Sequence, residues 1–433
     1  MRTSEPQQQS SSVSVAANFQ KDHYSIKFWQ IVLAGFAVRI AGIFLFHTWR
    51  IDLAKDESAN IAASLAAGHG FANPFGGHTG PTAWLGPVYP FLLSWVFKVF
   101  GTFTRVSVFA ALVGNSFISA LTAIPVFVIA QKTFNLKVAR WSAWLWALFP
   151  YTAYWAIRWV WDTSLSALLF TLLFMMTLLL AESRSLSKWL LYGLLWALAG
   201  LTNTAEMAFL PFAAIWLLYQ QPNRDRVFWR NAALSIAIFL AALTPWTVRN
   251  YEVFHKFMPV RGNFGVEFHL GNTLNAEGLW QFWLHPSQDP NEFKLYKEMG
   301  EVAYAKSKLH QTLKFIHQHP EHFAFLTTAH FVYYWAGVPH SEKYRGIYAL
   351  KSSMFLASTL LAIFGVAQAL RKRRPGAILY LLLLLSYPTI YYITFAHPRY
   401  RHPIEPEILI LAVYIFTEAE KQPRATAIEI SSS

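Results

Sequence analysis

Residues 163–181 read TSLSALLFTLLFMMTLLLA, a run of apolar and small residues that contains no charged side chain. The run falls within the roughly 17–25 residues that an α-helix needs to cross the hydrocarbon core of a bilayer. It therefore predicts a transmembrane helix. Similar runs recur on both sides of it, and together they predict an all-α, polytopic membrane protein with about ten transmembrane helices.

The other predicted spans lie on both sides of this run. They cover residues 28–47, 106–131, 138–157, 188–201, a segment ending near 219, and then 229–248, 351–370, 378–395 and 404–416. Residues 84–101 are apolar too, but they form a short segment that Pro87 and Pro90 interrupt. They predict a re-entrant or interfacial segment, because irregular backbone at membrane depth must be covered by protein.

The composition agrees with a membrane protein and argues against a soluble protein and against a nucleic-acid-binding protein. The 433 residues are 55% hydrophobic and only 14% charged, whereas soluble domains are about a quarter charged. The net charge is +13, but in so apolar a chain this excess indicates cytoplasmic loops rather than a nucleic-acid partner. The chain contains no cysteine, which excludes disulfides and a thiolate nucleophile.

The basic residues fix the predicted orientation. They gather in alternate connections, at Lys132, Lys137 and Arg140, at Arg184 and Lys188, at Arg224, Arg226 and Arg230, and at residues 371–374. Short loops rich in Lys and Arg are typical of the cytoplasmic side. We therefore expect a multi-pass protein of the inner (plasma) membrane, with both termini in the cytoplasm and the functional site outside it.

These expectations divide the chain into five parts. Residues 1–27 and 418–433 are predicted to be disordered cytoplasmic tails. Residues 28–248 form a transmembrane core that includes a first outer loop at 48–105, and residues 351–417 form the C-terminal transmembrane helices. Residues 249–350 form an extracytoplasmic loop domain. It contains a predicted helix over 301–318, whose apolar face would hold Val302, Ala305, Leu309, Leu313 and Ile316.

The first group of candidate site residues follows the first span. Asp56 and Glu57 precede a predicted short helix that Gly68 ends. Asp56 could simply cap this helix, with Glu57 favouring its dipole. Alternatively, a carboxylate held at the bilayer surface could act as a general base.

The second group begins the last span on the same side. Arg399, Tyr400, Arg401 and His402 would suit an anionic head group, because arginine offers fixed donors and keeps its proton. The alternative is interfacial anchoring by long side chains. Arg249, at the outer end of another span, has the same two interpretations.

Weaker candidates complete the set. Arg39 lies within the first span and must pair or extend to the membrane interface. Arg158 and Asp162 could bridge each other, and Glu206 starts a span on the outer side. Several histidines in the outer loop suggest a metal, but their spacing predicts no metal site, although a divalent cation remains possible. They are His310, His317, His319, His322 and His330.

Four short stretches resemble the bacterial branch of the GT-C superfamily of membrane glycosyltransferases, which is related to protein O-mannosyltransferases and aminoarabinose transferases. They are residues 55–57 (KDE), 85–90 (LGPVYP, with Phe100 and Gly101), 244–251 (TPWTVRNY) and 399–403 (RYRHP). They are spread over most of the chain and stand in the family's order.

The resemblance implies a GT-C-like bundle whose donor is a polyprenyl-phosphate-linked sugar, transferred outside the cytoplasm with inversion. The family's acidic residue in the first outer loop falls on Asp56, with Glu57 beside it. By position, Arg249, Arg399, Arg401 and Tyr400 are the candidates for holding the lipid phosphate, and Arg158, Asp162 and His402 are supporting candidates. The acceptor could be a lipid, a glycan or a protein, at a site surrounded by membrane lipids.

Two other functions are weighed against this one. A transporter or glycolipid flippase would place polar sites near the bilayer midplane, often within internal repeats, and the chain has few charges within its spans. A non-catalytic scaffold would use the outer loop to bind a partner. The leading hypothesis is a glycosyltransferase.

Overall fold

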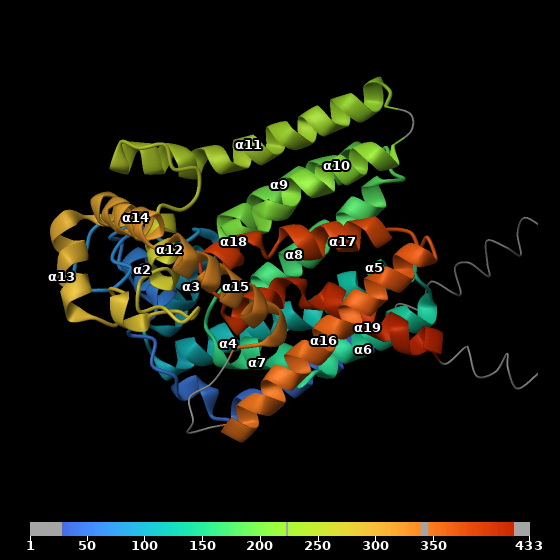
Figure 1. Ribbon diagram of the computed structural model, residues 1–433, viewed down its shortest axis with the longest axis horizontal. Helices are drawn as coiled ribbons and strands as arrows, with labels where there is room; N and C mark the ends of the chain where they lie inside the picture. The colour runs from blue at the N-terminus through green and yellow to red at the C-terminus, as the bar shows by residue number, and fades with distance from the viewer. Residues whose placement is uncertain (1–27, 222–223, 339–344, 420–433) are drawn as a thin grey trace, which may run out of the picture.

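The protein is an elongated bundle of helices capped at one end by shorter helices (Figure 1). The computed structural model describes residues 28–221, 224–338 and 345–419, so the predicted tail 1–27 and nearly all of the tail 418–433 lie outside the described residues. Within this part of the chain the only strand-like pairings are two isolated β-bridges. The prediction of an all-α polytopic fold is confirmed.

The bundle is formed by the following segments: residues Phe28–Leu45, α4 (Arg105–Leu121) with α5 (Ala123–Thr133), α6 (Leu136–Leu148) with α7 (Pro150–Arg158), α8 (Thr163–Leu180), α9 (Leu186–Thr202), η2 (Thr204–Phe209) with α10 (Leu210–Gln220), α11 (Arg226–Phe254), α16 (Arg345–Arg371), α17 (Ala377–Ser386) with α18 (Thr389–Ile393), and η5 (Pro398–Ile404) with α19 (Glu405–Ala419). Among the described residues, five helices are long and apolar enough to cross a membrane. The protein is an integral membrane protein.

Proline breaks two of the predicted spans into two helices each. Residues 138–157 divide at Pro150, and residues 378–395 divide at Pro388. Proline lacks the N–H that would bond the carbonyl four residues earlier. Near the first break, Arg39 donates from Nη1 to the Ala147 carbonyl at 2.7 Å and from Nη2 to the Trp146 carbonyl at 3.3 Å. The intramembrane arginine therefore pairs with backbone that a broken helix leaves free.

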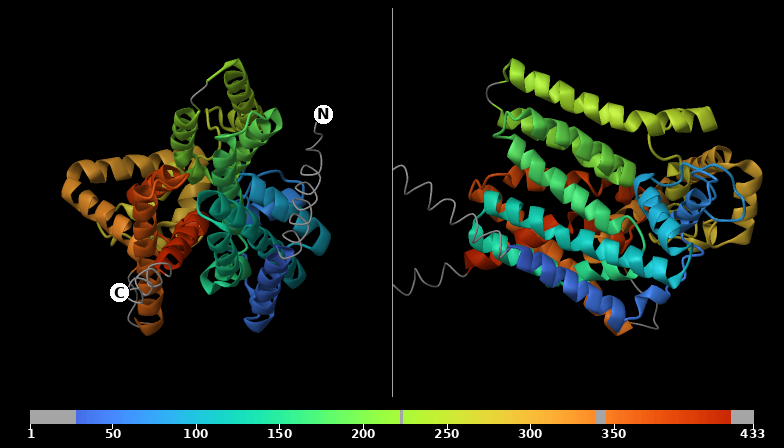
Figure 2. Two further views of the ribbon diagram at one scale, coloured as in Figure 1. Left: turned by 90° about the vertical axis from the view of Figure 1, so that its right-hand side faces the viewer. Right: turned by 180° about the vertical axis from the view of Figure 1, so that it is seen from behind.

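The predicted basic connections all lie at one end of the bundle, at the right in Figure 1. Neighbouring connections are tied there by ion pairs, Lys132 with Glu182 and Arg184 with Asp225, each at 2.7 Å. The first and last described segments begin and end at this same end (Figure 2). That arrangement agrees with the predicted even number of crossings.

The opposite end carries the first outer loop and the long outer segment. The first outer loop contains α2 (Glu57–Ala66) and α3 (Val88–Phe100), and α3 lies at this end of the bundle rather than crossing it (Figure 1). One side of α3 exposes Phe91, Trp95 and Val99, the last two by 66% and 70%. The helix thus has an apolar face for lipid, as predicted for an interfacial segment.

The long outer segment folds into α12 (Phe264–Gly271), α13 (Pro290–Met299), α14 (Glu301–Gln318) and α15 (Pro320–Ala336). We call residues 264–336 the cover. The buried Glu301 carboxylate fastens it to the first outer loop, because it accepts hydrogen bonds from the Thr82 hydroxyl, the Ala83 N–H and the Tyr296 hydroxyl.

The cover is also fastened to the C-terminal end of α18. His330 contacts the Tyr392 carbonyl through Nδ1 at 2.9 Å, and Asn272 donates to the Ile393 carbonyl at 2.7 Å. A Cβ on Gly271 would lie 1.8 Å from the Thr394 carbonyl oxygen, so only glycine allows this approach. Two separate sets of buried contacts therefore hold the cover in place.

Helix α14 has the predicted bounds. Of the five residues on its predicted apolar face, Ala305 is buried, Val302, Leu309 and Ile316 are half-buried, and Leu313 is 50% exposed. The buried side also carries Tyr304 and Lys308. Lys308 reaches Glu292 of α13 at 2.6 Å. An ion pair that links α13 and α14 thus replaces part of the apolar stripe.

Close packing of α9 on α11 provides a test of the fold. A Cβ on Gly193 would lie 2.1 Å from the Ser235 carbonyl oxygen, so Gly193→Ala must push α11 away. We expect the substitution to cost about 1–3 kcal/mol, seen as a lower Tm in detergent. Gly114→Ala is the control, since a Cβ there meets nothing within 4 Å. An unchanged Tm for Gly193→Ala would contradict the packing.

Candidate functional site

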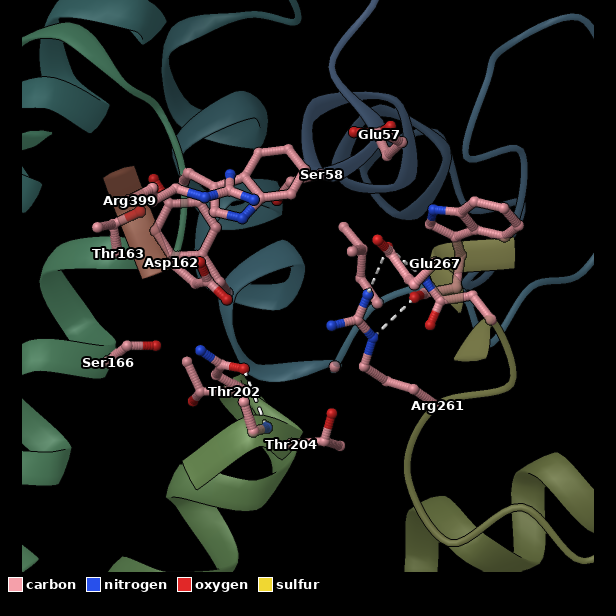
Figure 3. Close-up of a pocket in the computed structure, with 18 of the residues that line it drawn as sticks. Glu57, Ser58, Asp162, Thr163, Ser166, Thr202, Thr204, Arg261, Glu267 and Arg399 are labelled. Atoms are coloured by element: carbon pink, nitrogen blue, oxygen red, sulfur yellow. Dashed lines mark hydrogen bonds and ion pairs between the residues drawn. The ribbon is translucent and has the colours of Figure 1, made fainter. Parts of the chain in front are cut away.

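A cavity of about 1010 Å³ opens at the covered end of the bundle. Its walls come from distant parts of the chain, namely the start of α2, the connection from α7 to α8, η2, the cover and the loop that leads into α19. Figure 3 shows Arg399 and Asp162 on one side and Glu57, Glu267 and Arg261 on the other. Charged groups of both signs therefore face one cavity.

Asp56 lies at the N-terminus of α2 and lines this cavity. One carboxylate oxygen, Oδ1, accepts the Ala59 N–H at 2.9 Å and so caps the helix. Burial raises the pKa of Asp56 well above its usual value, and the neighbouring Glu57 carboxylate raises it further. The capping role is thus present, and it holds an unusually basic carboxylate at the cavity wall.

Glu57 lines the cavity beside Asp56, and burial raises its pKa to about 7. Its Oε1 lies 3.4 Å from Nε2 of His285, which belongs to the cover. The His285 Nδ1 atom accepts the Ser287 backbone N–H at 3.2 Å, so its proton lies on Nε2 and faces Glu57. Burial lowers the pKa of His285 to about 3, which keeps the ring neutral.

Arg399 is the cavity-lining residue among the arginines predicted to bind the lipid phosphate. Its guanidinium carbon lies 4.8 Å from the ring centre of Trp161 and 5.4 Å from those of Trp159 and Tyr400. Within the described residues no carboxylate lies within ion-pair distance of it. The aromatic rings hold the guanidinium in place, the Tyr400 hydroxyl also interacts with it, and no ion pair occupies its other donors. Tyr400 lines the cavity beside it.

Asp162 and Arg158 both line the cavity, but they do not form the predicted bridge. Arg158 ends α7 and α8 begins at Thr163, so the two residues do not share a helix on which a spacing of four would bring them together. Burial raises the pKa of Asp162 to about 6, and Arg399 opposes this shift.

Arg401, His402 and Arg249 lie away from the cavity. Arg401 is buried against α16 and pairs with Glu405 at 2.9 Å, so its guanidinium is already neutralised. His402 is fully buried, and neither of its ring nitrogens has a hydrogen-bond partner among the described residues. Arg249 donates to the carbonyls of Thr82 and Phe71, each at 2.7 Å, which fastens α11 to the first outer loop.

Sequence reasoning missed several charged or titratable residues of the cavity, among them Arg261, Glu267 and His285. Arg261 donates from Nε to the Trp84 carbonyl at 3.0 Å, and its Nη2 lies 3.6 Å from Glu267. The available signal for Arg261 was an arginine next to Gly262 and Asn263, in the stretch that opens the long outer segment. Nothing local marked Glu267 or His285.

No group of three or more His, Cys, Asp or Glu side chains in the described ranges is arranged to hold a metal ion. The outer-loop histidines are accordingly spread over the cover. One of them, His330, serves the fastening described above.

Comparison with known proteins identifies a family match within the bundle. Residues 85–248 match the family model described as dolichyl-phosphate-mannose-protein mannosyltransferase. This match confirms the resemblance to GT-C membrane glycosyltransferases that the motifs carry. No curated protein sequence matches the chain.

Solved structures with a similar fold include archaeal enzymes. The oligosaccharyltransferase AglB from Archaeoglobus fulgidus, in complex with an inhibitory peptide and a dolichol-phosphate, matches with a TM-score of 0.56 and 14% identity over 94% of this chain and 52% of that chain. The Archaeoglobus fulgidus oligosaccharyltransferase in complex with Zn and sulfate gives a TM-score of 0.54 and 14% identity, over 93% and 51%.

ArnT from Cupriavidus metallidurans bound to undecaprenyl phosphate gives a TM-score of 0.40 and 12% identity, over 90% of this chain and 77% of that one. At the identities of the archaeal matches, the similarity shows the fold alone. This chain spans about half the length of the AglB chain.

Proposed function

We propose that the protein is a glycosyltransferase that moves a sugar from a polyprenyl-phosphate-linked donor to a hydroxyl of an acceptor outside the cytoplasm. One observation carries the proposal. A single cavity at one end of a membrane bundle joins the basic carboxylate of Asp56 to the aromatically held guanidinium of Arg399. An acceptor hydroxyl needs a base, and a departing phosphate needs a fixed cation.

The reaction is a single displacement at the anomeric carbon. The acceptor oxygen forms the new glycosidic bond as the bond to the phosphate oxygen breaks, and this inverts the anomeric carbon. Asp56 takes the acceptor proton, and the lipid phosphate leaves with the bonding electrons. Arg399 stabilises the charge that grows on the phosphate, and it can do so without first breaking an ion pair.

A membrane-embedded donor needs an apolar path from the cavity, and part of the lining supplies one. Met207 and Ala208 of η2, Phe239 and Leu243 of α11, and Phe264 of α12 line the same cavity as the charged residues. Such a surface suits the first prenyl units of a lipid whose phosphate lies near Arg399. The family description, which names a dolichyl-phosphate sugar, and the dolichol-phosphate held by AglB support this donor class.

The proposed orientation places the cavity outside the cytoplasm. The opposite end carries the basic connections, which favour the cytoplasmic side of the inner (plasma) membrane. The acceptor, whether lipid, glycan or protein, would then approach from the outer face.

The decisive experiment compares a deletion strain with its parent by mass spectrometry of lipid-linked sugars and envelope glycans. We expect one polyprenyl-phosphate sugar to accumulate and one residue to be missing from a glycan, glycolipid or glycoprotein, which identifies donor and acceptor. Purified protein in proteoliposomes should then form that glycosidic bond from that donor. Movement of a labelled glycolipid across the vesicle membrane without any glycosidic product would instead establish a flippase.

The neighbouring carboxylates predict a particular pH response. A protonated Asp56 cannot accept a proton, so transfer should fall as the pH falls through its pKa, which Glu57 raises. Removing that charge in Glu57→Gln lowers the pKa of Asp56, and the acid limb of kcat/KM should move to lower pH. Profiles between about pH 5 and 9 measure this shift. Glu298→Gln, an exposed site on α13, is the matched control, and an acid limb that stays in place or rises would contradict the coupling.

A further inference from the structure

Asn115 is a buried amide in α4, only 3% exposed, that does not line the cavity. Its Nδ2 donates to the Trp159 carbonyl at 3.0 Å and lies 3.5 Å from the Trp161 carbonyl. The Tyr89 hydroxyl lies 3.0 Å from Nδ2 and 3.2 Å from Oδ1. One side chain thus joins α3, α4 and the short connection between α7 and α8.

That connection carries part of the site. Its side chains include Trp159 and Trp161, the two indoles that face the Arg399 guanidinium, and Asp162, which lines the cavity beside them. The connection belongs to no helix, so its own backbone hydrogen bonds are few, such as Trp161 N–H to the Trp159 carbonyl at 3.0 Å. The position of the indoles therefore depends on groups outside the connection.

We propose that Asn115 is the positioning residue for the phosphate-binding arginine, acting through the connection that holds Trp159 and Trp161 against Arg399. The inference rests on the proposed function, since it assigns Arg399 to the lipid phosphate. Asn115 touches neither substrate nor Arg399. Asn115 fixes the backbone that carries Trp159 and Trp161, and these two indoles hold the Arg399 guanidinium in place.

A buried amide is costly within a membrane helix unless it is paired. One explanation is that Asn115 merely gives the Trp159 carbonyl a second hydrogen bond where α7 ends. The same arrangement occurs at the far end of the bundle, where the fully buried Asn231 donates to the Arg184 carbonyl at 2.9 Å. Asn231 contacts no part of the cavity, so it provides a matched comparison for a purely structural role.

The test is a double-mutant cycle on binding of undecaprenyl phosphate, the lipid phosphate without a sugar, to the full-length protein in detergent. We expect Asn115→Leu to raise the Kd about tenfold, and to raise it less than about twofold in an Arg399→Ala background, because residues that act through one another are not additive. Asn231→Leu should lower the Tm and leave the Kd unchanged. If Asn115→Leu does not fold, Asn115→Ser replaces it in the cycle.

The outcomes are separable. Equal weakening by Asn115→Leu in both backgrounds, or an unchanged Kd in the wild-type background, would show that Asn115 is only structural. Tyr89→Phe keeps the bond from Asn115 to Trp159 and should change the Kd by less than about threefold. A larger effect would assign the positioning role to Tyr89 instead. A wild-type protein that binds no lipid phosphate would remove the proposed function itself, and with it the role of Arg399.

Discussion

Asp56→Asn is expected to abolish sugar transfer while leaving the protein folded in the membrane. An amide cannot accept the acceptor proton, and loss of a general base costs about 10²- to 10⁴-fold in rate. Asparagine caps helices as well as aspartate does, so the bond to the Ala59 N–H can persist. The measurement is the initial rate of glycosidic product, with the donor and acceptor found in the deletion strain, beside the Tm of each variant.

Asp56→Ala separates the two roles of this residue. It removes both the base and the cap, so we expect the same loss of transfer together with a loss of about 1 kcal/mol in stability. Asp56→Asn should show the first effect without the second. Full activity of Asp56→Asn would disprove the assignment of the base and direct attention to Glu57 or Asp162.

Arg399→Ala is expected to reduce kcat/KM about 100- to 1000-fold, because it removes the fixed charge that faces the leaving phosphate. Arg399→Lys should recover only part of this loss. An ammonium group is a point charge that cannot stack on Trp161 or present two parallel donors. Steady-state kinetics with the polyprenyl-phosphate sugar measure both variants.

Two other arginines serve as comparisons. Arg105→Ala changes an exposed residue at the start of α4 outside the cavity, and its kcat/KM should match the wild type. Arg401→Ala should instead destabilise the fold by about 3–5 kcal/mol, because it leaves the buried Glu405 unpaired. If Arg399→Ala retains more than about a third of the wild-type kcat/KM, Arg399 does not stabilise the leaving phosphate.

Much of the fold could be predicted from the sequence because its signals are local. A charge-free run such as residues 163–181 can only be buried or face lipid, and the helix found there spans Thr163–Leu180. The basic connections are a local signal too, and they marked one end of the bundle. The buried face of α14 could not be predicted from local signals. Lys308 is buried on it because it pairs with Glu292, which lies on another helix, α13.

The part of the candidate site that could be predicted lies where the order of helix and loop is easily read from the sequence. Asp56 and Glu57 lie one short loop after the first span and stand at the start of a helix, so their place at the covered end of the bundle was readable. Arg399 and Arg401 could not be told apart by position alone. The helix η5 turns the first toward the cavity and the second toward α16, and Glu405, four residues after Arg401, was the available sign that Arg401 is paired.

Residues supplied by the cover were invisible in the sequence. His285 and Glu267 reach the cavity only because α12 packs on α14 and the chain returns over the first outer loop. No spacing in the sequence encodes that approach. Only the tertiary contacts of the folded chain bring these side chains to the cavity.

The two fastenings of the cover have a consequence for turnover. Lifting the cover would break the bonds that Glu301 accepts and those of His330 and Asn272 in one event, and each buried group left without a partner costs about 1–3 kcal/mol. The fastened cover is therefore one wall of the cavity and is costly to lift. In the proposed reaction we expect the cover to stay in place while substrates enter and leave beside it.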